Sequence, residues 1–106
     1  MTQDETLAEV VKRTLMVLPQ TRHLLLFGSR ARGEARPDSD YDLLLVAPGL
    51  PTERARTTQL RLALRGLGAA FDIVALTPEE FAELQRSDAW YAREIRLSSR
   101  ELLRVA

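Results

Sequence analysis

The chain contains 106 residues, and its 15 basic and 15 acidic side chains give a formal net charge of zero at pH 7, which argues against nonspecific nucleic-acid binding through a basic stripe. This length suffices for one small domain with a single core, and we expect no separate substrate-binding module. The chain has no cysteine and a single histidine, His23, which excludes thiolate catalysis, structural zinc sites and paired-histidine metalloprotease motifs.

The first predicted elements are an amphipathic helix and two short buried strands. Apolar residues recur at three- and four-residue spacings over residues 3–18, which is typical of a helix, and Thr2 with Glu5 forms a predicted capping box at its start. The continuous apolar runs 23–27 and 41–47 are short and predict strands that are buried on both faces. The first half therefore predicts the order helix, strand, turn, strand.

The second half of the chain continues with helices that have recognisable N-terminal caps. Thr52 and Glu53 open a predicted helix. The apolar run 71–76 predicts a third strand, and it is followed by a second capping box, formed by Thr77 and Glu80. A short helix is therefore expected directly after the third strand.

The last predicted elements are a helix capped by Ser87 and Asp88 and a final strand over residues 101–105, which we favour over a continuation of the helix. No linker or internal repeat divides the chain, so residues 1–106 are expected to form one domain. The order of the elements predicts a compact α/β or α+β fold, with a small mixed β-sheet flanked by helices.

Three aspartates stand out because they occur at or inside predicted strands. Asp40 and Asp42 point to the same side of an extended strand, with their Cα atoms about 6.5–7 Å apart. Asp72 is the second residue of the run FDIVAL and interrupts an otherwise apolar strand. If the second and third strands are neighbours in register, Asp72 lies within about 5 Å of Asp42, measured between their Cβ atoms.

Three carboxylates in one small volume need compensation for their charge. Two carboxylates about 5 Å apart repel each other by roughly 3 kcal/mol at an effective dielectric constant near 20. Either one carboxyl group stays protonated or a divalent metal ion lies between them, unless Asp72 lies elsewhere and no cluster forms. Ligands that are all oxygens, with open positions for water and phosphate, favour Mg²⁺.

The Gly28–Ser29 turn supplies features of a phosphate site. Its glycine lets the backbone approach a ligand closely, and its serine offers a hydroxyl and an amide at the start of a short helical turn, where free N–H groups attract anions. Arg30 and Arg32 add cationic donors, although an ion pair of Arg32 with Asp38 or Asp42 is an equal alternative. The glycine spacing fits neither a Walker loop nor a dinucleotide-binding fingerprint.

The string GSRARG, which begins at Gly28, and the string SDYDLLLV, which begins at Ser39, together resemble the motif block of the nucleotidyltransferase superfamily built around the palm-like core of DNA polymerase β. The chain looks like the minimal nucleotidyltransferases, the short prokaryotic branch. The resemblance extends from the first predicted helix to near Glu94, and residues 27–46 carry nearly all of its specificity. It implies the nucleotidyltransferase fold for a single minimal domain.

The resemblance also implies roles for individual residues. Asp40 and Asp42 would bind two Mg²⁺ ions, and Asp72 would complete the catalytic metal site and could accept the proton of the attacking hydroxyl. Residues of the motif block would hold the phosphates of the nucleotide. The candidates for nucleotide binding are Gly28, Ser29, Arg30, Arg32 and Ser39.

The implied reaction is the Mg²⁺-dependent transfer of AMP from ATP to a hydroxyl acceptor, with pyrophosphate leaving. Proteins of the minimal branch are commonly paired with a small helical HEPN-type ribonuclease toxin, so the resemblance implies an antitoxin that adenylylates a tyrosine of such a toxin. Two alternatives stay open: a noncatalytic antitoxin that neutralises its partner by binding, and a small-molecule nucleotidyltransferase that modifies an antibiotic.

Cellular location and assembly are the last expectations. No apolar run approaches membrane-spanning length and the N-terminus lacks the layout of a signal peptide, so we expect a cytoplasmic protein without a membrane partner. Direct binding of nucleic acid is not expected either. The sequence leaves both homo-oligomers and hetero-oligomers open.

Overall fold

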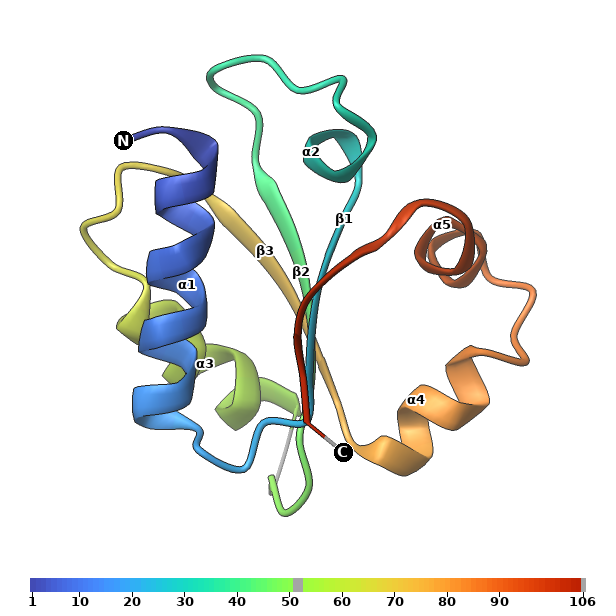
Figure 1. Cartoon of the computed structure of the whole chain (residues 1–106). Coiled ribbons are helices and arrows are strands. Elements are labelled where there is room, and N and C mark those ends of the chain that lie inside the picture. The colour runs from blue at the N-terminus through green and yellow to red at the C-terminus, as the bar shows by residue number, and fades with distance from the viewer. Residues whose placement is uncertain (51–52, 106) are drawn as a thin grey trace.

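The computed structural model describes residues 1–50 and 53–105 of the chain. In these ranges a mixed β-sheet is covered by helices on both of its faces (Figure 1). The helices are α1 (Gln3–Val17), α2 (Ser29–Arg32), α3 (Glu53–Ala63), α4 (Pro78–Leu84) and α5 (Trp90–Ser98). The strands are β1 (His23–Phe27), β2 (Tyr41–Val46), β3 (Phe71–Leu76) and β4 (Arg100–Arg104).

The sheet has the strand order β3-β2-β1-β4. β1 runs antiparallel to both of its neighbours, whereas β2 and β3 are parallel and are connected through α3. The register of β2 with β3 matches Asp42 with Asp72, and the register of β1 with β2 matches Phe27 with Asp42. The prediction of a small mixed sheet flanked by helices is therefore confirmed.

Two apolar cores lie on the two faces of the sheet. α1 and α3 cover one face, against which Leu43 and Leu45 of β2 pack, and α4 and α5 cover the other face, against which Leu44 and Val46 pack (Figure 1). All four side chains are buried. The unbroken apolar run of β2 follows from this arrangement, because successive side chains of a strand point to opposite faces and both faces are covered.

The predicted capping boxes are confirmed at the starts of α1 and α4. Thr2 accepts a hydrogen bond from the backbone N–H of Glu5 and the Glu5 carboxylate accepts one from the N–H of Thr2. Thr77 and Glu80 form the same reciprocal pair. The hydrogen bonds from Thr2 hold the pKa of the exposed Glu5 carboxyl below its ordinary value. The strand predicted for the C-terminal segment is also confirmed by β4.

The cap predicted for the last helix is wrong. The N-cap of α5 is Ala89, which makes no side-chain capping hydrogen bond. The Ser87 hydroxyl accepts a hydrogen bond from the Ala89 N–H at 3.1 Å, so it closes the preceding turn rather than the helix, and Asp88 is exposed. The cap predicted at Thr52 lies outside the described residues.

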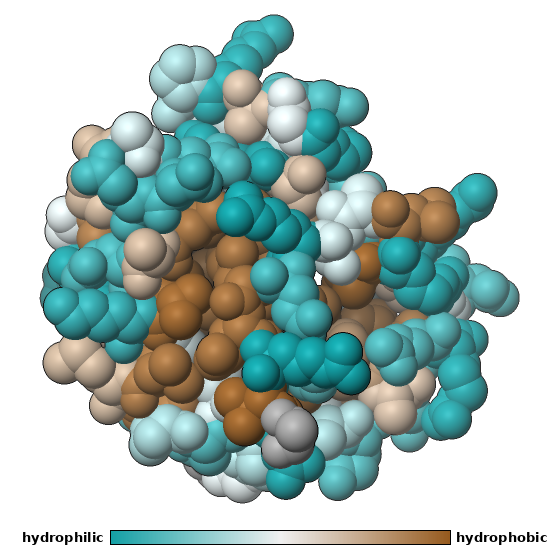
Figure 2. Space-filling model, in the orientation of Figure 1, coloured by the Kyte–Doolittle hydropathy of each residue, from teal (hydrophilic) through white to brown (hydrophobic). Residues whose placement is uncertain are grey.

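The surface between α1 and β4 carries visible apolar side chains amid hydrophilic ones (Figure 2). Leu102 and Leu103 of β4 are partly buried there and pack against the core beneath α1. Among the helices of residues 1–50 and 53–105, none is both long and apolar enough to cross a membrane.

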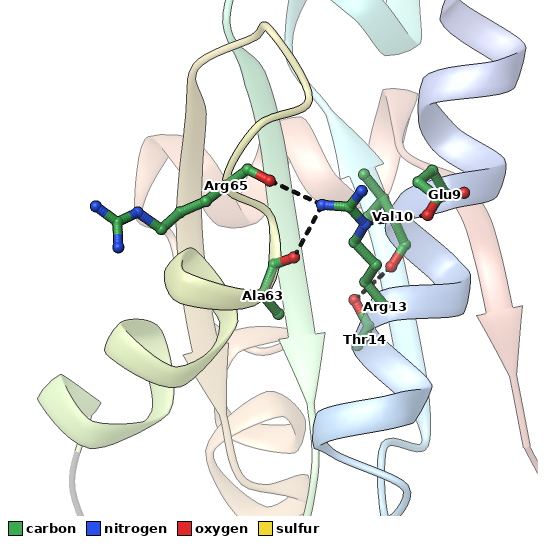
Figure 3. A network of polar contacts seen from close by, with 6 residues as sticks. All are labelled: Glu9, Val10, Arg13, Thr14, Ala63 and Arg65. Carbon is green, nitrogen blue, oxygen red and sulfur yellow. Dashed lines mark hydrogen bonds and ion pairs between the residues drawn. The ribbon is translucent and has the colours of Figure 1, made fainter.

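Arg13 connects α1 to the C-terminal end of α3 (Figure 3). Its Nη1 donates hydrogen bonds to the carbonyl oxygens of Arg65, at 2.8 Å, and Ala63, at 3.3 Å, while its Nε donates to Glu9 at 3.0 Å. The last carbonyl groups of a helix lack intrahelical partners and attract positive charge. Arg13 therefore caps a helix that is 50 residues away in the sequence.

Replacing Arg13 with Ala is expected to lower the free energy of unfolding by about 1–2 kcal/mol, because it leaves these carbonyl groups without a charged donor. Urea unfolding followed by circular dichroism measures the change. Lys12→Ala is the matched control, since Lys12 is exposed on the same helix, and we expect it to stay within about 0.5 kcal/mol of the unsubstituted protein. Equal effects of the two substitutions would contradict the capping role.

Candidate active site

The predicted carboxylates gather at one end of the sheet. Asp42 and Asp72 are each the second residue of their strand, and the parallel pairing of β2 with β3 places them directly beside each other. The neighbours of Asp42 in β2 face α1, so the Asp42 side chain points to the other face of the sheet. Phe27, with which Asp42 is matched, packs on that other face, in the core beneath α4 and α5. Asp42 and Asp72 therefore share the face of the sheet that α4 and α5 cover.

The charges of Asp40 and Asp72 act on the Asp42 carboxyl. Partial burial raises the pKa of the Asp42 carboxyl, the charges of Asp72 and Asp40 raise it further, and Arg32 lowers it. The ionised form of Asp42 is thus disfavoured by its surroundings. A positive charge bound beside Asp42 would favour its ionised form.

The acidic residues fit a hard cation in their chemistry, but they do not form a finished metal cage. In residues 1–50 and 53–105, no three acidic, histidine or cysteine side chains are arranged closely enough to hold a metal ion as they stand. The donors that Asp40, Asp42 and Asp72 offer are all carboxylate oxygens, which are the ligands that Mg²⁺ prefers. A divalent cation would also relieve the repulsion at Asp42.

Gly28 brings the turn after β1 directly against Asp42. Its backbone has φ 75° and ψ −159°, a conformation that is essentially restricted to glycine. A Cβ atom at this position would lie 3.0 Å from Cγ of Asp42 and would overlap one of its carboxylate oxygens. The Asp42 carboxylate therefore occupies the space that a side chain at residue 28 would need.

Ser29 begins the short helix α2. The backbone N–H groups of Ala31 and Arg32 donate to the carbonyl of Gly28, both at 3.1 Å, so the helical turn closes directly on the glycine. The first N–H groups of a helix have no intrahelical acceptor and can bind an anion. The structure thus confirms the short helical turn expected here.

Arg30 points into the loop that leads to β2. Its Nε donates to the carbonyl of Ser39 at 2.9 Å, and its Nη2 donates to the carbonyl of Pro37 at 3.2 Å. Its Nη1 donates to the side chain of Gln3 at 3.0 Å, and the guanidinium lies 4.0 Å from the ring centroid of the buried Tyr41. Arg30 therefore ties the loop, the first helix and β2 together.

Ser39 closes a turn in the same loop. Its hydroxyl accepts a hydrogen bond from the Arg36 N–H at 2.8 Å, and its own N–H donates to the Arg36 carbonyl at 3.0 Å. The contacts of Ser39 and Arg30 thus fix the segment that ends at Asp40. Both were predicted to bind nucleotide, and within the structure their partners are parts of the protein.

Arg32 contacts two glutamates, one at the start of this loop and one on α5. Its Nε donates to Glu34 at 3.0 Å and its Nη1 contacts Glu94 of α5. The sequence suggested Asp38 or Asp42 as ion-pair partners, and the ion pairs observed are with Glu34 and Glu94 instead. The sequence did not reveal Glu94 as a partner of Arg32, because the two residues are 62 positions apart and no motif contains Glu94.

A hollow of about 620 Å³ lies on the same face of the sheet but at the opposite end of the strands. His23 and Leu25 of β1, Phe81 of α4 and Ile95 of α5 contribute to its walls. None of the predicted site residues lines it. The carboxylates are therefore outside this hollow, and Asp40 and Asp72 are exposed.

The amino-acid sequence matches the family model described as nucleotidyltransferase domain over residues 7–103. This range contains Gly28, Ser29 and all three aspartates. A search of curated proteins finds no significant match.

Several solved structures have a similar fold. A chain of a toxin–antitoxin crystal structure with AMP-PNP is 18% identical, with a TM-score of 0.70, 93% of this chain covered and 73% of that chain. A complex of a tri-AMPylated Shewanella oneidensis HEPN toxin with an MNT antitoxin gives 16% identity, a TM-score of 0.66 and coverages of 98% and 74%. A protein from Sulfolobus solfataricus described as a nucleotidyltransferase is 29% identical, with a TM-score of 0.57 and coverages of 73% and 69%.

Gly28→Ala is expected to lower the free energy of unfolding by about 3 kcal/mol or more, because the new methyl group combines backbone strain with the overlap at Asp42. Gly33→Ala is the matched control, since Gly33 has φ 74° but no atom within 4 Å of an added Cβ. It should cost only about 1–2 kcal/mol, from the left-handed backbone alone. Urea unfolding compares the two, and equal losses would contradict the close packing of Asp42 on Gly28.

Asp42→Asn is expected to stabilise the metal-free protein. The pKa of Asp42 is raised in the folded state, so ionised Asp42 reduces stability at neutral pH. This cost decreases as the pH falls through the raised pKa of the folded state and is gone below the pKa of the unfolded state. Because solvent screens the partly exposed group, we expect the midpoint of thermal unfolding to rise by about 2–4 °C at pH 7, and by less at pH 4.5.

Differential scanning calorimetry in EDTA measures these midpoints. Asp88→Asn is the control, since Asp88 is exposed in the turn before α5, and it should leave the midpoint unchanged. A midpoint that falls on Asp42→Asn would contradict the repulsion among the three carboxylates.

Proposed function

The chain belongs to the nucleotidyltransferase domain family, and we propose that it is the AMP-transferring antitoxin of a toxin–antitoxin pair. In this proposal it transfers AMP from ATP to a tyrosine hydroxyl of a helical HEPN-type partner protein. The observation that carries the proposal is the in-register pairing of Asp42 with Asp72 beside the Gly28 turn. This arrangement supports the proposal, because acidic groups and a turn with free N–H groups would both be needed close to the phosphates of one nucleotide.

We assign Asp40 and Asp42 as ligands of two Mg²⁺ ions and Asp72 as the carboxylate that completes the catalytic metal site. The support is the all-oxygen donor set together with the raised pKa of Asp42, which a nearby cation would return toward its ordinary value. When bound, Mg²⁺ supplies positive charge to the phosphate oxygens of the transferring group.

The acceptor hydroxyl attacks the α-phosphorus of ATP in line with the leaving group. A new bond forms between the hydroxyl oxygen and the α-phosphorus, while the bond from that phosphorus to the bridging oxygen of the β-phosphate breaks and pyrophosphate leaves. Asp72 accepts the proton of the hydroxyl. The products are an AMP-modified acceptor and pyrophosphate.

The nucleotide-binding residues divide into two groups in this proposal. The Gly28–Ser29 turn binds phosphate oxygens through its N–H groups and the serine hydroxyl, and Arg32 adds a cationic donor. Arg30 and Ser39 serve the nucleotide indirectly, since they fix the loop that ends at Asp40.

The partner and the nucleotide are proposed from the similar structures. One is a toxin–antitoxin structure with AMP-PNP, an ATP analogue, and another contains an AMPylated HEPN toxin bound to its antitoxin. The fold they share with this chain is compatible with the same assembly. A noncatalytic antitoxin would gain nothing from three mutually repelling carboxylates, so we place catalysis first.

Labelled ATP tests the transfer directly. The protein is incubated with Mg²⁺ and the helical protein that copurifies with it, using ATP labelled in the α-phosphate and, separately, in the γ-phosphate. We expect the α-label alone to appear on the partner. Asp42→Asn should slow the labelling at least about 100-fold, because a ligand of the catalytic metal is lost.

Asp88→Asn is the matched control and should label the partner at the unsubstituted rate, since Asp88 lies on the exposed turn before α5. Neutralisation of the partner by both the unsubstituted protein and Asp42→Asn, without any label, would instead identify a noncatalytic binder. In a parallel incubation with an aminoglycoside antibiotic, label on the antibiotic but not on the partner protein would identify a small-molecule enzyme.

A further inference from the structure

Arg32 is held by acidic side chains from two different elements. Glu34, which follows α2, accepts from Nε at 3.0 Å, and Glu94 of α5 contacts Nη1. The Glu34 side chain is 65% exposed and that of Glu94 is 24% exposed. Because solvent screens an exposed ion pair much more than a partly buried one, Glu94 is the stronger anchor.

The helix that carries Glu94, α5, is itself packed against the sheet. Its Ala92 and Ile95 are buried in the core beneath α4 and α5. Figure 1 shows α5 beside the end of the sheet at which α2 lies. The helix that carries Glu94 is therefore held by the core and not by the motif loop that carries Arg32. Contact with Glu94 restricts the rotamers of a long side chain that would otherwise be mobile.

The guanidinium keeps donors available after these two contacts. It has five N–H groups in a planar fork, and the two ion pairs occupy Nε and part of Nη1. Within residues 1–50 and 53–105, Nη2 of Arg32 donates no hydrogen bond. Arg32 also lies near the carboxylates, because its backbone N–H donates to the carbonyl of Gly28, and the Gly28 turn packs directly against Asp42.

We propose that Glu94 is a positioning residue, which holds Arg32 so that its free N–H groups bind the β- or γ-phosphate of the nucleotide. The inference rests on the proposed function. A guanidinium with a fixed plane matches two phosphate oxygens at once, and fixing it in advance reduces the entropy lost on binding. Glu94 thus links α5 to nucleotide affinity without touching the reacting atoms.

Binding of ATP and of AMP to the folded protein separates this role from a general structural one. Isothermal titration calorimetry in Mg²⁺ should show the Kd of ATP rising about 3- to 10-fold in Glu94→Ala and much less in Glu94→Gln, which can still accept a hydrogen bond from Arg32. The Kd of AMP, which lacks the β- and γ-phosphates, should not change in either variant.

A double-substitution cycle tests whether Glu94 acts through Arg32. In an Arg32→Ala background, Glu94→Ala should cause no further loss of ATP affinity. Glu101→Ala is the matched control, since Glu101 also makes an ion pair, with His23, but lies on β4 away from the carboxylates, and it should leave the Kd of ATP unchanged.

Three results would overturn the inference. They are an unchanged Kd of ATP in Glu94→Ala, a tighter Kd, which would make Glu94 a competitor of the phosphates, and an equal loss of AMP affinity. Each of these leaves the proposed function intact. Failure of the unsubstituted protein to bind ATP at all would overturn both the inference and the proposed function.

Discussion

The parallel pairing of β2 with β3 is the constraint on which the rest of the site depends. It matches Asp42 with Asp72, although like charges beside each other on a sheet are destabilising. The same pairing matches Leu43 with Ile73, both buried, so burial along the strands offsets the repulsion at their ends. The register cannot slip by one residue, because a slip would turn every apolar side chain of a strand to the wrong face. The fold therefore holds the carboxylates together at a cost that a bound cation would remove.

The turn after β1 and the loop before β2 both pack at the end of the sheet that carries the carboxylates. Gly28 leaves room for the Asp42 carboxylate by having no side chain, so the turn after β1 and the start of β2 are fitted to each other. Arg30 holds the loop before β2 through its hydrogen bonds to the carbonyls of Ser39 and Pro37. Backbone geometry on one side and a guanidinium on the other thus set where Asp40 and Asp42 can lie.

What the sequence predicted correctly was local or repetitive. The capping box of Thr2 spans three residues, and the apolar runs of the strands reflect a sheet that is covered on both faces, so both leave a pattern in the sequence. The partners of Arg30 could not be read in this way, because they are mostly backbone carbonyls, which every residue has. The contact of Arg32 with Glu94 crosses 62 residues and depends on where α5 packs. The predicted cap of α5 is wrong for a related reason, because the Ser87 hydroxyl accepts a hydrogen bond within the turn that precedes the helix.

The motif GSRARG contains two arginines that look equivalent in the sequence, yet the structure gives them opposite directions. Residues two positions apart in a helix do not share a face, so in α2 Arg30 turns toward Tyr41 and the loop while Arg32 turns toward α5. Each guanidinium nitrogen of Arg30 donates to another part of the protein, whereas Nη2 of Arg32 donates no hydrogen bond within residues 1–50 and 53–105. The spacing of one residue between them therefore separates the structural role of Arg30 from the phosphate-binding role that we propose for Arg32, and a four-residue helix suffices for both.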